Sequence, residues 1–111
     1  LILGMRSDSE KAGAKFVMFS HVGKIEGDPS HLAALQAGYS GLAFDVGKAE
    51  RELRKFADAN GVAMISSTAQ VEAEKDLYFG IDDDHMNAKG YEVVAKALAE
   101  DLRKQGLLPV N

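Results

Sequence analysis

One short stretch of this sequence brings together residue types that can move protons. Three consecutive carboxylates are followed at once by an imidazole, in Asp82-Asp83-Asp84-His85. Asp82 and His85 lie three residues apart, so one turn of the chain can bring a carboxylate against the imidazole. An imidazole held in this way accepts the proton of a hydroxyl nucleophile, while the carboxylate fixes its tautomer and stabilises the imidazolium. The stretch therefore predicts a general base, His85, and an orienting acid, Asp82.

The residues that follow predict how this stretch is held in place. Asn87 stands directly before a segment that suits a helix from about Ala88 to Gln105, and its side chain suits the N-cap. Apolar residues recur along that segment at helical spacing: Tyr91, Val94, Leu98 and Leu102. We therefore assign Asn87 a structural role, in which it pins the loop that carries His85.

Two compact apolar runs, 15–20 and 62–65, have the pattern of strands that are buried on both faces of a parallel sheet. The segment 45–60 between them has the pattern of an amphipathic helix, with Asp45 suited to its N-cap and Gly61 to its left-handed end. The order strand, helix, strand predicts a parallel crossover and an α/β fold with flanking helices.

The segment 21–44 is rich in Gly and contains Pro29, which predicts a long irregular connection with a short helix around His31 to Ala37. Residues 1–12 favour a helix. Open parallel sheets bind ligands at the carboxyl ends of their strands, and His21 and Lys24 follow the first predicted strand. They are candidates for substrate contact, although polar loop residues without a role are the alternative.

The pattern Asp-x-x-His-x-Asn-x-x-Gly-Tyr, which runs from Asp82 to Tyr91 before a terminal amphipathic helix, resembles the last conserved block of the SGNH (GDSL-type) serine hydrolases. The resemblance covers residues 78–102 best, and the preceding elements are similar to the second half of that family's three-layer, flavodoxin-like fold. It implies hydrolysis of acyl or acetyl esters of carbohydrates or lipids, with no metal and no organic cofactor. It carries over His85 as general base and Asp82 as orienting acid.

The resemblance does not extend to the nucleophile. The family's serine lies in a Gly-Asp-Ser turn after the first strand, and its oxyanion-hole Gly and Asn come from two later blocks, none of which is recognisable here. Ser7-Asp8-Ser9 is similar to that turn, but Ser7 stands in place of the Gly. We therefore expect residues 1–111 to be a single partial domain, the C-terminal half of an SGNH hydrolase-like domain, inactive without its missing N-terminal part.

Composition excludes several other classes of function. A net charge of -4 and a pI near 5.3 provide no basic surface for a nucleic-acid backbone. No apolar run approaches the roughly 18 residues that a membrane span needs. The absence of Cys excludes disulfides and thiol nucleophiles but does not determine the compartment, so localisation stays unknown.

Other interpretations of the acidic stretch and of the whole chain remain open. The stretch 82–85 also suits a divalent cation, or a solvated loop at the N-terminus of a helix. The same scaffold could serve as a non-catalytic carbohydrate-binding or interaction module. Because a two-stranded sheet is marginal in water, the remaining core is expected from a third strand in the first segment, from upstream sequence, or from a second copy in a homo-oligomer.

Overall fold

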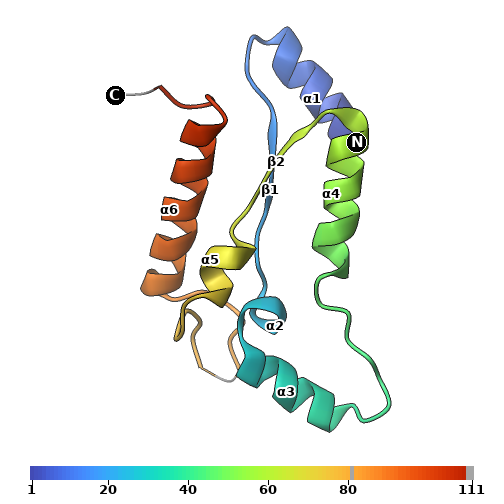
Figure 1. Cartoon of the computed structure of the whole chain (residues 1–111), viewed down its shortest axis with the longest axis vertical. Coiled ribbons are helices and arrows are strands. Elements are labelled where there is room, and N and C mark those ends of the chain that lie inside the picture. Colours follow the sequence, from blue (N-terminus) through green and yellow to red (C-terminus); the bar gives the residue numbers. More distant parts are fainter. Residues whose placement is uncertain (81, 110–111) are drawn as a thin grey trace.

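The computed structural model describes residues 1–80 and 82–109, and Figure 1 shows an elongated molecule in which helices flank a small sheet. The described elements follow one another along the chain as α1 (Ile2–Lys11), β1 (Val17–Ser20), α2 (Lys24–Gly27), α3 (Pro29–Gly38), α4 (Lys48–Asn60), β2 (Ala63–Ser66), α5 (Thr68–Glu72) and α6 (Ala88–Lys104). The predicted mixed α/β class is confirmed at this level.

In the described ranges the sheet consists of β1 and β2, which pair in parallel with Val17 opposite Ala63 and Ser20 opposite Ser66. The helices α4 and α6 lie on opposite sides of the strands, and both contact β2 (Figure 1). The carboxyl ends of both strands point to the end of the molecule that holds α2, α3, α5 and the loop before α6 (Figure 1). This end is where a parallel sheet places its functional residues.

The apolar core is divided into two clusters of buried residues. One lies between the sheet and α4 and consists of Ala57, Val62 and Met64, with Phe16, Met18 and Leu53 packed against it. The other lies near the carboxyl ends of the strands and consists of Val22, Val71, Leu77, Met86 and Val94. The second cluster includes Met86, the residue after His85, and so anchors the loop that carries the candidate base.

The predicted helix 45–60 forms as α4, but it begins later than predicted. Gly47 is its N-cap, whereas Asp45 accepts two hydrogen bonds from the Arg51 guanidinium, at 2.7 and 2.6 Å. The Asp45 N-cap prediction is therefore wrong, because its carboxylate is engaged by a guanidinium from the first turn. The left-handed end is confirmed, since Gly61 has φ +60°.

The connection 21–44 is more helical than predicted. The expected short helix forms as the longer α3, which Pro29 begins and Asp28 caps through hydrogen bonds from the N–H groups of Ser30 and His31. The helices α2 and α5 were not predicted. The predicted N-terminal helix is confirmed as α1.

The final helix also forms where predicted, although its buried face is displaced. Gly90, Val94 and Ala97 are buried, whereas Tyr91 is 53% exposed. The absence of a side chain at Gly90 lets the first turn approach the Leu77 carbonyl and Met86 closely, which turns Tyr91 outward. In the described ranges, no helix is long and apolar enough to cross a membrane.

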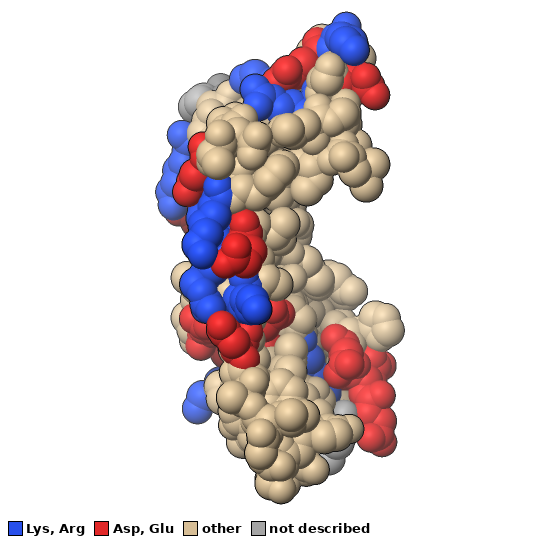
Figure 2. Space-filling model, turned by 90° about the vertical axis from the view of Figure 1, so that its right-hand side faces the viewer, with Lys and Arg blue, Asp and Glu red and all other residues tan. Residues whose placement is uncertain are grey.

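The molecule is more extended than a compact domain of its length. Its radius of gyration is 16.3 Å, against about 13 Å for a compact chain of this size. Its accessible surface is 7520 Å², against about 6,000 Å² for a folded protein of this mass. Figure 2 shows charged side chains along one edge, a hollow at mid-height on the opposite side, and an acidic group directly below this hollow. Several large hydrophobic residues are exposed, among them Leu3, Met5, Leu42 and Phe79.

Candidate active site

The candidate base, His85, contacts a carboxylate in the loop before α6. Its Nδ1 lies 2.7 Å from Asp83 Oδ1, and its backbone N–H donates to the same oxygen at 2.9 Å. This backbone hydrogen bond, followed by the hydrogen bond from the ring, lowers the pKa of the Asp83 carboxyl from its ordinary value. The side chain of His85 is 81% exposed. The imidazole of His85 is therefore oriented by Asp83 and exposed to solvent.

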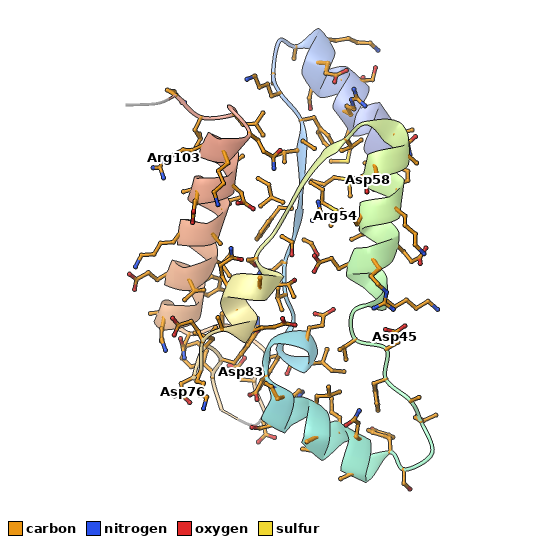
Figure 3. All side chains as sticks on the ribbon, viewed as in Figure 1. Asp45, Arg54, Asp58, Asp76, Asp83 and Arg103 are labelled. Atoms are coloured by element: carbon orange, nitrogen blue, oxygen red, sulfur yellow. The ribbon has the colours of Figure 1, made fainter. Side chains whose placement is uncertain are left out.

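The carboxylate in this contact is Asp83, whereas the sequence pattern predicts Asp82. The described hydrogen bonds of the His85 ring and of its N–H go to Asp83, and Asp82 is exposed. The physical reason is local, because an Asp side chain readily accepts from the backbone N–H two residues ahead, and that geometry also brings the ring to the same oxygen. Figure 3 labels Asp83 on this loop, at the end of the molecule that holds α2 and α3.

Asn87 fixes the start of α6 and ties it to the preceding loop. Its Oδ1 accepts from the Gly90 N–H at 3.0 Å, as an N-cap does, and its Nδ2 donates to the carbonyls of Asp76 at 2.7 Å and Tyr78 at 3.3 Å. Its own N–H donates to the Leu77 carbonyl at 2.9 Å. The structural role predicted for Asn87 thus has a direct counterpart in these bonds.

The backbone on either side of His85 is held by a short antiparallel contact. Tyr78 and Met86 form an antiparallel bridge, and the Phe79 N–H donates to the carbonyl of His85 at 3.0 Å. Met86 is 2% exposed and packs in the second core cluster. The candidate base is therefore exposed at its ring but anchored at its backbone and by the next side chain.

Lys24, a predicted substrate contact, is buried in the structure. It is 5% exposed, and its ammonium donates to the carbonyls of Phe79 at 3.1 Å, Gly80 and Asp83 at 2.9 Å. An ammonium has three protons, and these three acceptors use them all. Lys24 also lines the wider groove described below, and its contact with substrate stays a prediction. The sequence could not reveal these hydrogen bonds, because the acceptors lie more than fifty residues away along the chain.

His21, the other predicted substrate contact, is exposed at the carboxyl end of β1. Its ring centroid lies 6.2 Å from that of Phe19. A small hollow of about 50 Å³ includes His21 together with the carboxylates of Glu26, Glu50 and Glu72. No described hydrogen bond joins His21 to Asp83 or His85, and its role stays a prediction.

A wider groove of about 730 Å³ lies between the start of α3 and the chain segment 74–80. Its described lining includes His31, Tyr78 and the exposed Phe79 but neither Asp83 nor His85. His31 stands at its edge with Nε2 3.8 Å from Asp84 Oδ1. The groove therefore lies next to the candidate base, but His85 does not line it.

The hydroxyl groups of the chain do not complete a catalytic triad in the described ranges. Ser7 and Ser9 lie within α1, at the opposite end of the molecule from the loop before α6 (Figure 1), and the Ser9 hydroxyl donates to the Met5 carbonyl at 2.9 Å. At the end of β2, the Ser66 hydroxyl donates to Thr68 Oγ1, which in turn donates to Glu50. None of these hydroxyls is described as a hydrogen-bond partner of His85.

The acidic stretch does not converge on one point. Asp83 holds His85, while Asp84 lies near His31. Within residues 1–80 and 82–109, no group of three or more His, Asp or Glu side chains is placed to hold a metal ion.

Comparisons with protein-family profiles, with curated proteins and with solved structures gave no match for this chain. Functional assignment therefore rests on the sequence pattern and on the geometry of the site.

Proposed function

We propose that this chain is the C-terminal portion of a serine ester hydrolase of the SGNH type, in which His85 is the general base and Asp83 the carboxylate that orients it. The contact between Asp83 Oδ1 and His85 Nδ1, at 2.7 Å, carries the proposal. With Nδ1 as the donor to the carboxylate, Nε2 is the nitrogen that accepts the proton of a hydroxyl.

The fold that we propose for the complete domain is the three-layer, flavodoxin-like architecture of that family. Three features support it: β1 and β2 are parallel, helices lie on both sides of them, and the candidate base stands at the carboxyl end of the strands. The pattern from Asp82 to Tyr91, followed by an amphipathic helix, supports the same placement.

In the proposed reaction His85 takes the proton of a serine hydroxyl as the serine oxygen attacks the ester carbonyl. The imidazolium, stabilised by Asp83, then gives this proton to the departing alcohol, and water releases the acyl group by the same route in reverse. The serine and the oxyanion-hole donors come from sequence outside residues 1–111. The proposed substrate is an acyl or acetyl ester of a carbohydrate or lipid, and the family resemblance alone supports this class.

The test is hydrolysis of p-nitrophenyl acetate by the full-length parent polypeptide and by residues 1–111, each beside a His85→Ala variant. We expect turnover by the parent only, and its loss in the parent that carries His85→Ala. Turnover that survives His85→Ala would remove His85 from the mechanism. A parent that folds but lacks turnover would favour the non-catalytic carbohydrate-binding or interaction module, which glycan binding by the same preparation would then test.

A further inference from the structure

The three carbonyl groups around Lys24 form an enclosed site for a cation. The oxygens of Phe79, Gly80 and Asp83 converge on one ammonium nitrogen whose residue is 5% exposed. A buried charge is tolerated only when hydrogen bonds replace its lost hydration, and three carbonyl dipoles do so here. Lys24 therefore links the backbone at Phe79 and Gly80 to the backbone at Asp83.

One of these acceptors belongs to the residue that orients the candidate base. The carbonyl of Asp83 receives a hydrogen bond from Lys24 at 2.9 Å, while its side chain receives two from His85 at 2.9 and 2.7 Å. The position of the Asp83 carboxylate depends on the position of its own backbone. Lys24 thus affects the position of His85 through one residue, Asp83.

The backbone just before Lys24 is held by hydrogen bonds to two other side chains. Lys24 is the first residue of α2, and the N–H of the N-cap residue Gly23 donates a hydrogen bond to the Glu26 carboxylate at 2.8 Å. The Tyr78 hydroxyl lies 3.2 Å from the carbonyl oxygens of Val22 and Gly23, just before Lys24. Hydrogen bonds therefore hold the backbone just before Lys24, and the Lys24 ammonium in turn binds the carbonyl of Asp83.

We propose that Lys24 is a positioning residue: its buried ammonium fixes the backbone that carries Asp83 and thereby maintains the Asp83–His85 pair, a catalytic role that rests on the proposed function. Lys24 does not touch substrate in this role. The arrangement requires a compact cation with three donors that diverge from one atom. A planar guanidinium has its donors in a fork and does not match three carbonyls that converge on one point.

The first experiment measures hydrogen exchange at individual amides of residues 1–111 and does not require enzymatic activity. In Lys24→Met we expect the His85 amide, which donates to Asp83, to exchange about tenfold faster or more. The Gly90 amide, which the Asn87 cap protects, should keep its protection and show that α6 is intact. Unchanged exchange at His85 in the folded variant would overturn the proposal.

A matched control is available in Lys89. Its ammonium also donates to a backbone carbonyl, that of Lys75 at 2.8 Å, but has no described contact with Phe79, Gly80 or Asp83. We expect Lys89→Met to leave exchange at His85 unchanged, and an equal acceleration in this control would overturn the proposal. If Lys24→Met does not fold, Lys24→Arg keeps the charge but not the geometry, and the same acceleration at His85 is expected.

The second experiment measures esterase kinetics of the parent polypeptide. We expect Lys24→Met to lower kcat by about 10- to 100-fold, because small displacements of catalytic groups reduce the rate to this extent. KM should change little, because no contact with substrate is removed. An active parent whose kcat is unaffected by Lys24→Met would overturn the positioning role. An inactive wild-type parent would instead overturn the proposed function and leave the exchange result as the test of Lys24.

Discussion

At the scale of single residues, Asp82 and Asp83 differ in one contact that a pair of matched variants can resolve. Only Asp83 has a described hydrogen bond to the His85 ring, so Asp83→Asn should lower kcat of the parent polypeptide by about 100-fold or more, the usual range for disturbing a general base. Asp82→Asn should leave kcat nearly unchanged. The measurement is the kinetics of ester hydrolysis. A larger decrease in kcat for Asp82→Asn than for Asp83→Asn would identify Asp82 as the orienting acid, as the family spacing predicts.

Tyr78 gives a prediction about pH. Burial, followed by the negative charges of Glu26 and Asp28, raises the pKa of the Tyr78 phenol from 10.0 to about 12. A raised pKa in the folded state means that the associated stability is complete below pH 10 and is lost as the pH rises toward about 12, because the unfolded chain ionises first. The urea midpoint of the native chain should therefore fall across this interval.

The control for this pH effect is Tyr78→Phe, which removes the ionisable group. Its urea midpoint should depend less on pH over the same interval, although the variant should be about 1 kcal/mol less stable at neutral pH because the carbonyls of Val22 and Gly23 lose a donor. Equal pH dependence in the two proteins would contradict the assignment. The ultraviolet absorbance of tyrosinate gives an independent measure of the Tyr78 titration.

The sequence identifies the residue types of the candidate site better than their partners. The predictions for His85 and for the N-cap of Asn87 follow from local spacing, because the Asp83–His85 contact and the Asn87–Gly90 cap each join residues two or three positions apart. Three consecutive Asp residues offer three carboxylates, and spacing alone cannot decide which one reaches the imidazole. The contacts of Lys24 join segments more than fifty residues apart, so no local pattern contains them.

At the scale of elements, the first turn of α6 depends on the absence of a side chain at Gly90. A Cβ atom there would overlap the Leu77 carbonyl oxygen and lie 3.0 Å from Met86 Cβ. Gly90→Ala should therefore destabilise the fold by roughly 2–3 kcal/mol, as overpacking against backbone does. Gly4→Ala, in the exposed helix α1 with no atom within 4 Å, should instead stabilise by about 0.5–1 kcal/mol. Urea denaturation measures both, and equal effects at the two positions would contradict the close approach.

Elements with strong periodicity were predictable, and short ones were not. The patterns of α4 and α6 extend over 13 and 17 residues, long enough for their spacing to be distinctive. By contrast, α2 and α5 have four and five residues, too few to display a period. They are stabilised by tertiary contacts such as those of Lys24 and Val71, which the sequence does not display.

At the scale of the whole molecule, the sheet is covered on its two faces but has little support along its edges. Helices contact β2 from both sides, and its residues Met64 and Ile65 are buried, whereas no residue of β1 is buried and Phe19 is 37% exposed. Since an exposed strand edge carries unpaired backbone groups, a chain of this shape gains stability from any further strand beside β1.

This shape predicts a low free energy of unfolding for residues 1–111. The value should lie below the roughly 5–15 kcal/mol of ordinary domains. The parent polypeptide should unfold at higher urea, because in the proposed complete domain additional sequence covers β1. Urea unfolding of both proteins by circular dichroism, with small-angle scattering, tests this. A midpoint for residues 1–111 that rises with protein concentration would indicate a homo-oligomer in place of upstream sequence. A concentration-independent monomer of ordinary stability and a radius of gyration near 13 Å would contradict the open-edged structure, because burial on that scale requires β1 to be covered within the chain itself.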